Sequence, residues 1–219
     1  MKKHVKTILA VSVMAASTIA SSAAFAGASG NIGFTSDYFF RGVDQGSGAT
    51  ASAGLDYSHD SGIYVGTWVA DVTVGMEYDL YGGYAGEVSG FSYDIGYYTY
   101  NYTNDAFDDT YKEGLLTVGY GPVSVSYAKG KYDNYGTEQD YTFASITGEY
   151  EGFYGTYGSW GDDFDGSYVE VGYGTSIADW DAGVALISAD DTLAPTPDST
   201  GSIQGDVSVV FNIGRSFDF

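Results

Sequence analysis

Residues 207–219, at the end of the chain, read VSVVFNIGRSFDF and alternate between apolar and polar side chains. The apolar positions share one parity: Val207, Val209, Phe211, Ile213, Phe217 and Phe219. Because side chains alternate between the two faces of a β-strand, this pattern predicts a strand with one apolar face. A chain that ends on such a strand, with Phe as its last residue, is typical of outer-membrane barrels whose last strand pairs with the first. We therefore expect Phe217 and Phe219 to form the signal that barrel-assembly machinery recognises.

The beginning of the chain predicts export. Lys2, Lys3 and Lys6 precede an apolar run over residues 8–20, and Ala-Phe-Ala follows at residues 24–26. This is the pattern of a secretory signal peptide with its cleavage site, and the apolar run is too short for a spanning helix. We expect residues 1–26 to be removed, which leaves residues 27–219 as a single domain.

Alternation with a period of two continues through the rest of the chain and predicts twelve strands. They lie at about 31–41, 49–58, 62–70, 75–87, 90–102, 111–120, 122–129, 140–150, 152–160, 166–176, 180–189 and 203–219. Their lengths suit tilted strands that cross a bilayer, and no later stretch has 18 consecutive apolar residues. The predicted fold is therefore all-β: a transmembrane, antiparallel, up-and-down barrel, because only a closed barrel satisfies strand edges in lipid.

The connections between these strands alternate in length. The longer ones lie at 42–48, 71–74, 103–110, 130–139, 161–165 and 190–202, and the short ones at 59–61, 88–89, 121, 151 and 177–179. Bacterial barrels place short turns in the periplasm and longer loops outside, which predicts periplasmic termini. Acidic residues gather in the longer loops. They either keep a solvated surface or bind divalent cations that bridge to lipopolysaccharide.

Charge and composition exclude several classes of protein. The chain has 29 acidic residues, and without residues 1–26 its cations are Arg41, Lys112, Lys129, Lys131 and Arg215. Such an acidic surface argues against nucleic acid as a partner. The 22 Tyr and 12 Phe argue against a disordered acidic tail. The absence of Cys argues against a disulfide scaffold or a thiolate metal site, and we expect no cofactor.

Several segments resemble the TorF family of porins. Residues 33–42 (GFTSDYFFRG) carry the most specific similarity, and residues 54–62 (GLDYSHDSG) and 66–68 (GTW) follow it. Residues 79–84 (DLYGGY) and 93–97 (YDIGY) extend the resemblance along nearly all of the chain after residue 26. It implies an outer-membrane channel and supplies no catalytic residues.

If the apolar parity faces lipid, the opposite parity places carboxylates in the lumen. The candidates for lining a pore are Asp37, Arg41, Asp56, Glu77, Asp79, Asp94, Glu170, Asp181 and Asp206. Acids along a narrow passage concentrate cations and repel anions, which predicts a cation-preferring channel for small hydrophilic solutes. Alternatively, these carboxylates accept hydrogen bonds from interior Tyr, Ser and Arg groups and fill the barrel.

Two arginines have alternative roles. Arg41, expected at the outer end of the first strand, either pairs with lumen acids or narrows the entrance, and pairing is favoured. Arg215 interrupts the apolar parity of the last strand. It either lies at the periplasmic interface or turns inward through a bulge at Gly214.

Other classes of function are less favoured. His59, Asp60 and Ser61 are residue types of a hydrolase, but neighbours in one tight turn rarely form a catalytic arrangement, so we expect turn chemistry and no enzyme. A non-conducting structural or adhesive barrel with acidic loops is the alternative to a channel. In either case the partners are outer-membrane lipid and lipopolysaccharide.

Overall fold

The computed structural model describes residues 27–45, 48–73, 75–103, 110–134, 136–193 and 207–219. The expected signal peptide (residues 1–26), the pore candidate Asp206 and most acids of the 103–110 and 190–202 loops lie outside the described residues. Among the described residues, no helix is long and apolar enough to cross a membrane.

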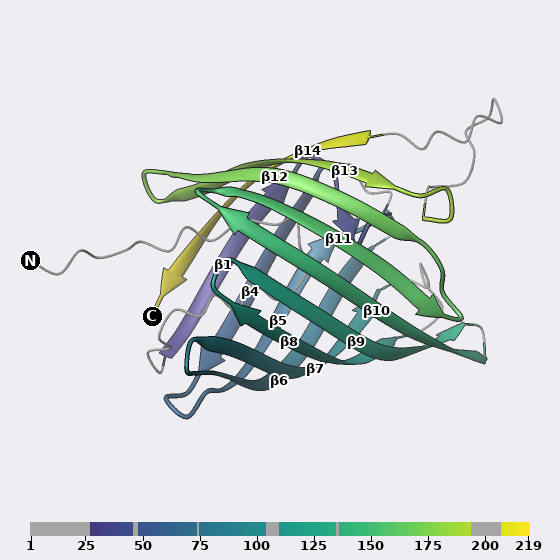
Figure 1. Cartoon of the computed structure of the whole chain (residues 1–219), viewed down its shortest axis with the longest axis horizontal. Coiled ribbons are helices and arrows are strands. Elements are labelled where there is room, and N and C mark those ends of the chain that lie inside the picture. The colour runs from purple at the N-terminus through teal and green to yellow at the C-terminus, as the bar shows by residue number, and fades with distance from the viewer. Residues whose placement is uncertain (1–26, 46–47, 74, 104–109, 135, 194–206) are drawn as a thin grey trace, which may run out of the picture.

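The described chain forms fourteen strands, of which twelve close into one antiparallel barrel (Figure 1). The barrel strands are β1 (Gly27–Thr35), β4 (Thr50–Ser58), β5 (Ile63–Asp71), β6 (Met76–Val88), β7 (Phe91–Tyr102), β8 (Tyr111–Tyr120), β9 (Val123–Asn134), β10 (Thr137–Tyr150), β11 (Phe153–Asp162), β12 (Ser167–Ile177), β13 (Trp180–Ala189) and β14 (Val207–Asp218). Each strand pairs with its neighbour in the chain, and β14 pairs with β1. The prediction of a twelve-stranded up-and-down barrel is confirmed.

The two ends of the barrel differ in their connections. At the turn-side end, which also holds both termini of the described barrel, connections such as Ser89–Gly90 and Glu151–Gly152 are tight turns with positive φ angles. At the loop-side end lie the connections β1–β4, β7–β8 and β13–β14, which are the longest. One predicted long loop, 130–139, is wrong, because β9 continues to Asn134 and β10 already begins at Thr137.

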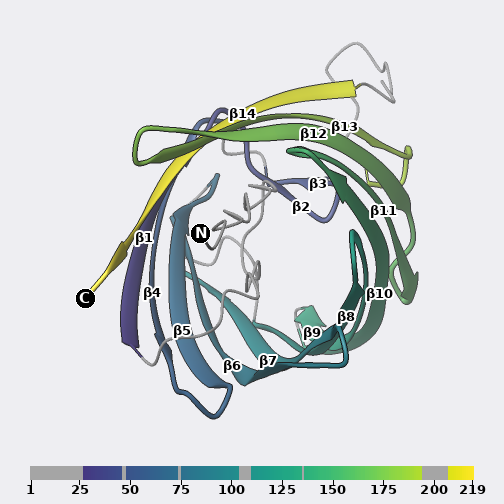
Figure 2. The ribbon, with the colours of Figure 1, turned by 60° about the vertical axis from the view of Figure 1, so that its left-hand side comes forward.

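The first strand is the main departure from the sequence prediction of 31–41. β1 begins at Gly27 and ends at Thr35, where the Thr35 hydroxyl donates to the Asp37 carbonyl and the Asp37 carboxylate accepts from the Tyr38 amide. These local bonds turn the chain out of the wall. Residues 36–45, called the inner hairpin below, carry β2 (Phe39–Phe40) and β3 (Val43–Asp44), which lie inside the ring of barrel strands (Figure 2).

The two faces of the wall follow the predicted parity. Outward positions such as Leu80, Ile95 and Phe211 are more than half exposed, as a lipid-facing surface requires. Aromatic side chains near the turn-side end are also exposed on this surface: Tyr57, Phe91, Tyr120, Trp180 and Phe219. Phe40, which the predicted first strand of 31–41 would place in the wall, instead packs inside the barrel against Tyr100 and Trp160.

The β14–β1 seam settles the position of Arg215. The register runs without a break from Thr35 opposite Asn212 to Ser29 opposite Asp218, so the bulge considered at Gly214 is absent and Arg215 keeps the outward parity. Its guanidinium lies 3.2 Å from the Asp179 carboxylate and 5.1 Å from the centre of the Phe217 ring. The half-buried arginine is thus held at the turn-side rim.

Candidate functional site

The inner hairpin reverses direction at Arg41 and Gly42, inside the lumen. Both residues have positive φ angles, 49° and 84°, as the two central residues of a type I′ turn require. A Cβ atom at position 42 would lie 2.7 Å from the Tyr168 side chain, so only Gly fits there. A positive φ at Arg41 is unfavourable for a non-glycine residue, and it persists because surrounding contacts hold the side chain.

The strongest of these contacts is an ion pair with Glu113 on β8. Arg41 Nη1 and Nη2 donate to Glu113 Oε2 and Oε1 at 2.8 and 2.6 Å, and the two side chains are 5% and 0% exposed. The hydroxyls of Tyr100 and Tyr141 donate to the same carboxylate at 2.9 and 3.0 Å. Four hydrogen bonds therefore compensate the burial of this carboxylate.

Aromatic rings complete the surroundings of the guanidinium. Arg41 Cζ lies 4.5 Å from the ring centre of Phe143, 4.8 Å from that of Phe40 and 5.6 Å from that of Trp160. The Trp160 indole also donates to the Arg41 carbonyl oxygen at 3.1 Å. These cation–π contacts and this hydrogen bond fix both the backbone and the side chain of the turn.

Two predicted lumen acids lie in the same loop-side half, on β6. The Tyr38 hydroxyl of the inner hairpin donates to Glu77 at 2.9 Å. Asp79 is fully buried, and neither of its carboxylate oxygens has a hydrogen-bond partner among the described residues. A buried carboxylate without partners is costly, which sets Asp79 apart from the other inward acids.

Most of the remaining predicted acids lie on the inward face and accept hydrogen bonds from the next strand or the next but one. The pairs are Tyr81–Asp56 at 2.6 Å, Tyr64–Asp94 at 2.9 Å, Tyr154–Glu170 at 2.5 Å and Ser176–Asp181 at 2.6 Å. Asp56, Asp94 and Asp181 lie towards the turn-side end and are only half-buried. Asp37 lies on the inner hairpin instead of the wall.

Sequence reasoning missed Glu113, the partner of Arg41. Glu113 shares the inward parity of β8 with Tyr111 and Leu115, and this alternation could have identified it as a lumen acid. Sequence reasoning considered interior tyrosines as donors to these carboxylates but assigned no pairs, because strand register decides which hydroxyl reaches which carboxylate.

The acids and the histidine outside the lumen show turn and capping contacts. Asp190 accepts hydrogen bonds from the backbone of Ser167 and Thr192; partial burial would raise its pKa, but these bonds lower it below the usual value. His59 Nδ1 lies 2.9 Å from the Ser61 hydroxyl within an exposed turn. No group of three or more His, Cys, Asp or Glu residues in the described part of the chain is placed to hold a metal ion.

Comparison with known proteins finds one family model and several porin structures that share the fold of this barrel. The family model described as "Bacterial protein of unknown function (Gcw_chp)" matches residues 19–217, and no curated protein matches the sequence. A KdgM porin structure has a TM-score of 0.55 at 10% identity, covering 87% of this chain and 99% of that one. The structure of KdgM porin in complex with disordered oligogalacturonate has a TM-score of 0.53 at 11% identity and covers the same shares of both chains. The NanC porin structure has a TM-score of 0.52 at 11% identity, covering 88% of this chain and 100% of that one. At these identities the similarity shows the fold of an outer-membrane porin.

Proposed function

The chain belongs to the Gcw_chp family, a bacterial family of unknown function, and from that starting point we propose that it is a porin-like outer-membrane channel for small hydrophilic solutes. The observation that carries this proposal is the closed barrel with an apolar outer face and a polar inner face. The similarity of residues 33–42 to the TorF porins supports the same function. We further propose that residues 1–26 are a cleaved export signal and that the turn-side end faces the periplasm.

Cation preference is the finer part of the proposal. The described inward-facing acids include Asp56, Asp94 and Asp181, whereas the inner hairpin's Arg41 is neutralised by Glu113. Half-buried carboxylates attract cations and oppose anions in a confined lumen. A polyanion such as the oligogalacturonate in the KdgM complex would meet repulsion here.

The predicted pore candidates divide by burial. We propose that Asp56, Asp94 and Asp181 contact passing solutes in the turn-side half. Arg41, Glu77, Asp79 and Glu170 are buried, so these residues shape the passage without lining its wetted surface, whereas Asp37 is half-buried on the inner hairpin and keeps its proposed role as a lumen acid. Asp206 keeps its proposed role as a lumen acid.

A second candidate is a non-conducting barrel. One observation favours it: the inner hairpin joins the wall residues Tyr98, Tyr141, Phe143 and Trp160 in a single buried cluster inside the barrel. In this case the loop-side half would be a plug, and the acidic loops would serve structure or adhesion.

Planar-bilayer recording of the refolded protein under a KCl gradient tests the two candidates. A channel gives discrete conductance steps, and a cation-preferring one gives a reversal potential of the corresponding sign. Folded protein, identified by heat-modifiable migration on gels, that produces no steps would overturn the channel. Steps with anion preference would overturn the charge argument and leave the channel intact.

A further inference from the structure

The outer face of the barrel carries a concentration of positive charge that the channel does not use. Of the cations that follow residue 26, Lys112 lies on β8, and Lys129 and Lys131 lie on the adjacent β9. All three are exposed and share the outward parity of the apolar positions. In a chain with 29 acidic residues, this clustering on two neighbouring strands is a distinct feature of the lipid-facing surface.

The strand register brings these like charges together. Lys112 lies directly opposite Lys131, and Lys129 lies opposite Gly114. Like charges at directly opposed positions destabilise a sheet unless a counter-charge compensates them. Lys131 has such partners, Glu138 and Asp140 on β10, whereas Lys112 and Lys129 make no ion pair with any residue that the structure describes.

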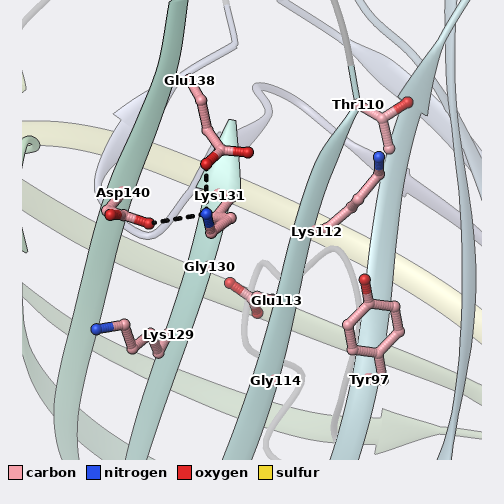
Figure 3. Close-up of a pocket in the computed structure, with 10 residues that line it drawn as sticks. All are labelled: Tyr97, Thr110, Lys112, Glu113, Gly114, Lys129, Gly130, Lys131, Glu138 and Asp140. Atoms are coloured by element: carbon pink, nitrogen blue, oxygen red, sulfur yellow. Dashed lines mark hydrogen bonds and ion pairs between the residues drawn. The ribbon is translucent and has the colours of Figure 1, made fainter. Parts of the chain in front are cut away.

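Both unpaired lysines line a hollow on the outer face; in Figure 3 the Lys112 side chain extends towards β7 and the Lys129 side chain towards β10, and both are long, flexible and exposed enough to turn over Gly114. Its volume is about 300 Å³, and it is lined by Tyr97, Thr110, Lys112, Gly114, Lys129 and Gly130, together with Glu113 and the ion-paired Lys131, Glu138 and Asp140. Gly114 stands between Tyr97 on β7 and Lys129 on β9, and a Cβ atom there would meet no other atom within 4 Å. The hollow therefore exists because this outward position has no side chain.

The position of the hollow along the barrel axis indicates which kind of ligand it binds. Further along β8 and β9 towards the turn-side end, the outward positions are apolar: Leu116, Val118, Val125 and Tyr127. The lysines thus lie at the loop-side edge of the apolar belt, where ammonium groups reach the phosphates of a membrane leaflet. With the loop-side end outside the cell, this leaflet is the one that contains phosphorylated glycolipid.

We propose that this hollow binds a phosphate group of an outer-leaflet glycolipid between Lys112 and Lys129, with the lipid's acyl chains along Leu116 and Tyr127. The phosphate compensates the two unpaired ammonium groups. The Lys131 ion pairs with Glu138 and Asp140 hold the third lysine at the upper rim and keep it from competing for the same position. The proposal depends on the outward placement of the loop-side end and is independent of conductance.

Native mass spectrometry of the refolded barrel in detergent, titrated with bisphosphorylated lipid A, tests the proposal. We expect retention of one lipid, about thirtyfold weaker binding by Lys112→Gln/Lys129→Gln, and near-normal binding by Lys112→Arg/Lys129→Arg. Arg215→Gln, which removes an outward cation at the opposite end, is the matched control and should bind normally. Equal binding by the double Gln variant and the unaltered protein would overturn the site.

Two further arms identify the ligand. Lipid A lacking both phosphates should not be retained, and inorganic phosphate at millimolar concentration should not displace the lipid. Displacement by inorganic phosphate would show a site for free phosphate and overturn the glycolipid assignment. Gly114→Leu fills the hollow from an outward position where a Cβ atom meets no other atom within 4 Å, so it should fold, migrate as a heat-modifiable barrel and lose lipid retention. Retention by this variant would place the lipid elsewhere.

Discussion

The two halves of the lumen use the same residue types in different ways. In the loop-side half, Glu77, Asp79 and Glu113 are buried, and the inner hairpin supplies the donors Tyr38 and Arg41 for two of them. In the turn-side half, Asp56 and Asp94 are half-buried and accept a tyrosine hydrogen bond from the wall itself. Inward carboxylates are therefore buried near the loops and only half-buried near the turns, and the proposed contact with solutes belongs to the second group.

Removing Glu113 should have the largest effect, because it leaves the Arg41 charge buried without its partner. For Glu113→Leu we expect a loss of about 3 to 5 kcal/mol in the free energy of unfolding, measured by urea titration in lipid vesicles. The turn-side half should stay intact until global unfolding, since its hydrogen bonds do not involve the hairpin.

The double variant Arg41→Met/Glu113→Leu is the control for this change. Replacing both charges by apolar groups removes the unpaired charge, so stability should largely return. A double variant as unstable as Glu113→Leu would show that the ion pair is not what holds the hairpin, and the contrast between the two halves would then rest on aromatic packing alone.

Asp79→Asn should have a smaller effect of the opposite sign. The carboxylate is fully buried and unpaired in the described structure, so replacing it by a neutral amide of the same shape should stabilise the barrel by about 1 to 2 kcal/mol. Glu77→Gln is the matched control on the same strand, and it should not stabilise because it weakens the bond from Tyr38. Destabilisation by Asp79→Asn would show that the charge is compensated in the folded barrel.

The sequence predicted the strands of the barrel wall better than the inner hairpin that lies in the lumen. Alternation placed Glu77, Asp79 and Asp94 on the inward face, because the side-chain period of a strand is a local property. The predicted first strand was wrongly extended into the inner hairpin, because residues 36–41 continue an aromatic-rich pattern that is also compatible with a strand. Local bonds at Thr35 and Asp37 turn the chain out of the wall, but the hairpin is held inside the lumen by Glu113, 72 positions further along the chain than Arg41, and no local pattern encodes that contact.

Substituting acids of the turn-side half should change the ion selectivity of the channel more than the stability of the barrel. For Asp56→Asn/Asp94→Asn we expect the cation preference in a KCl gradient to fall, because two accessible charges are lost. The amide oxygens still accept from Tyr81 and Tyr64, so unfolding should shift by only about 1 kcal/mol per site or less. Asp140→Asn removes an outward-facing charge and should leave selectivity unchanged. If Glu77→Gln lowered the cation preference as much as the double variant, solutes would contact both halves, and burial would not separate structural acids from those that line the path.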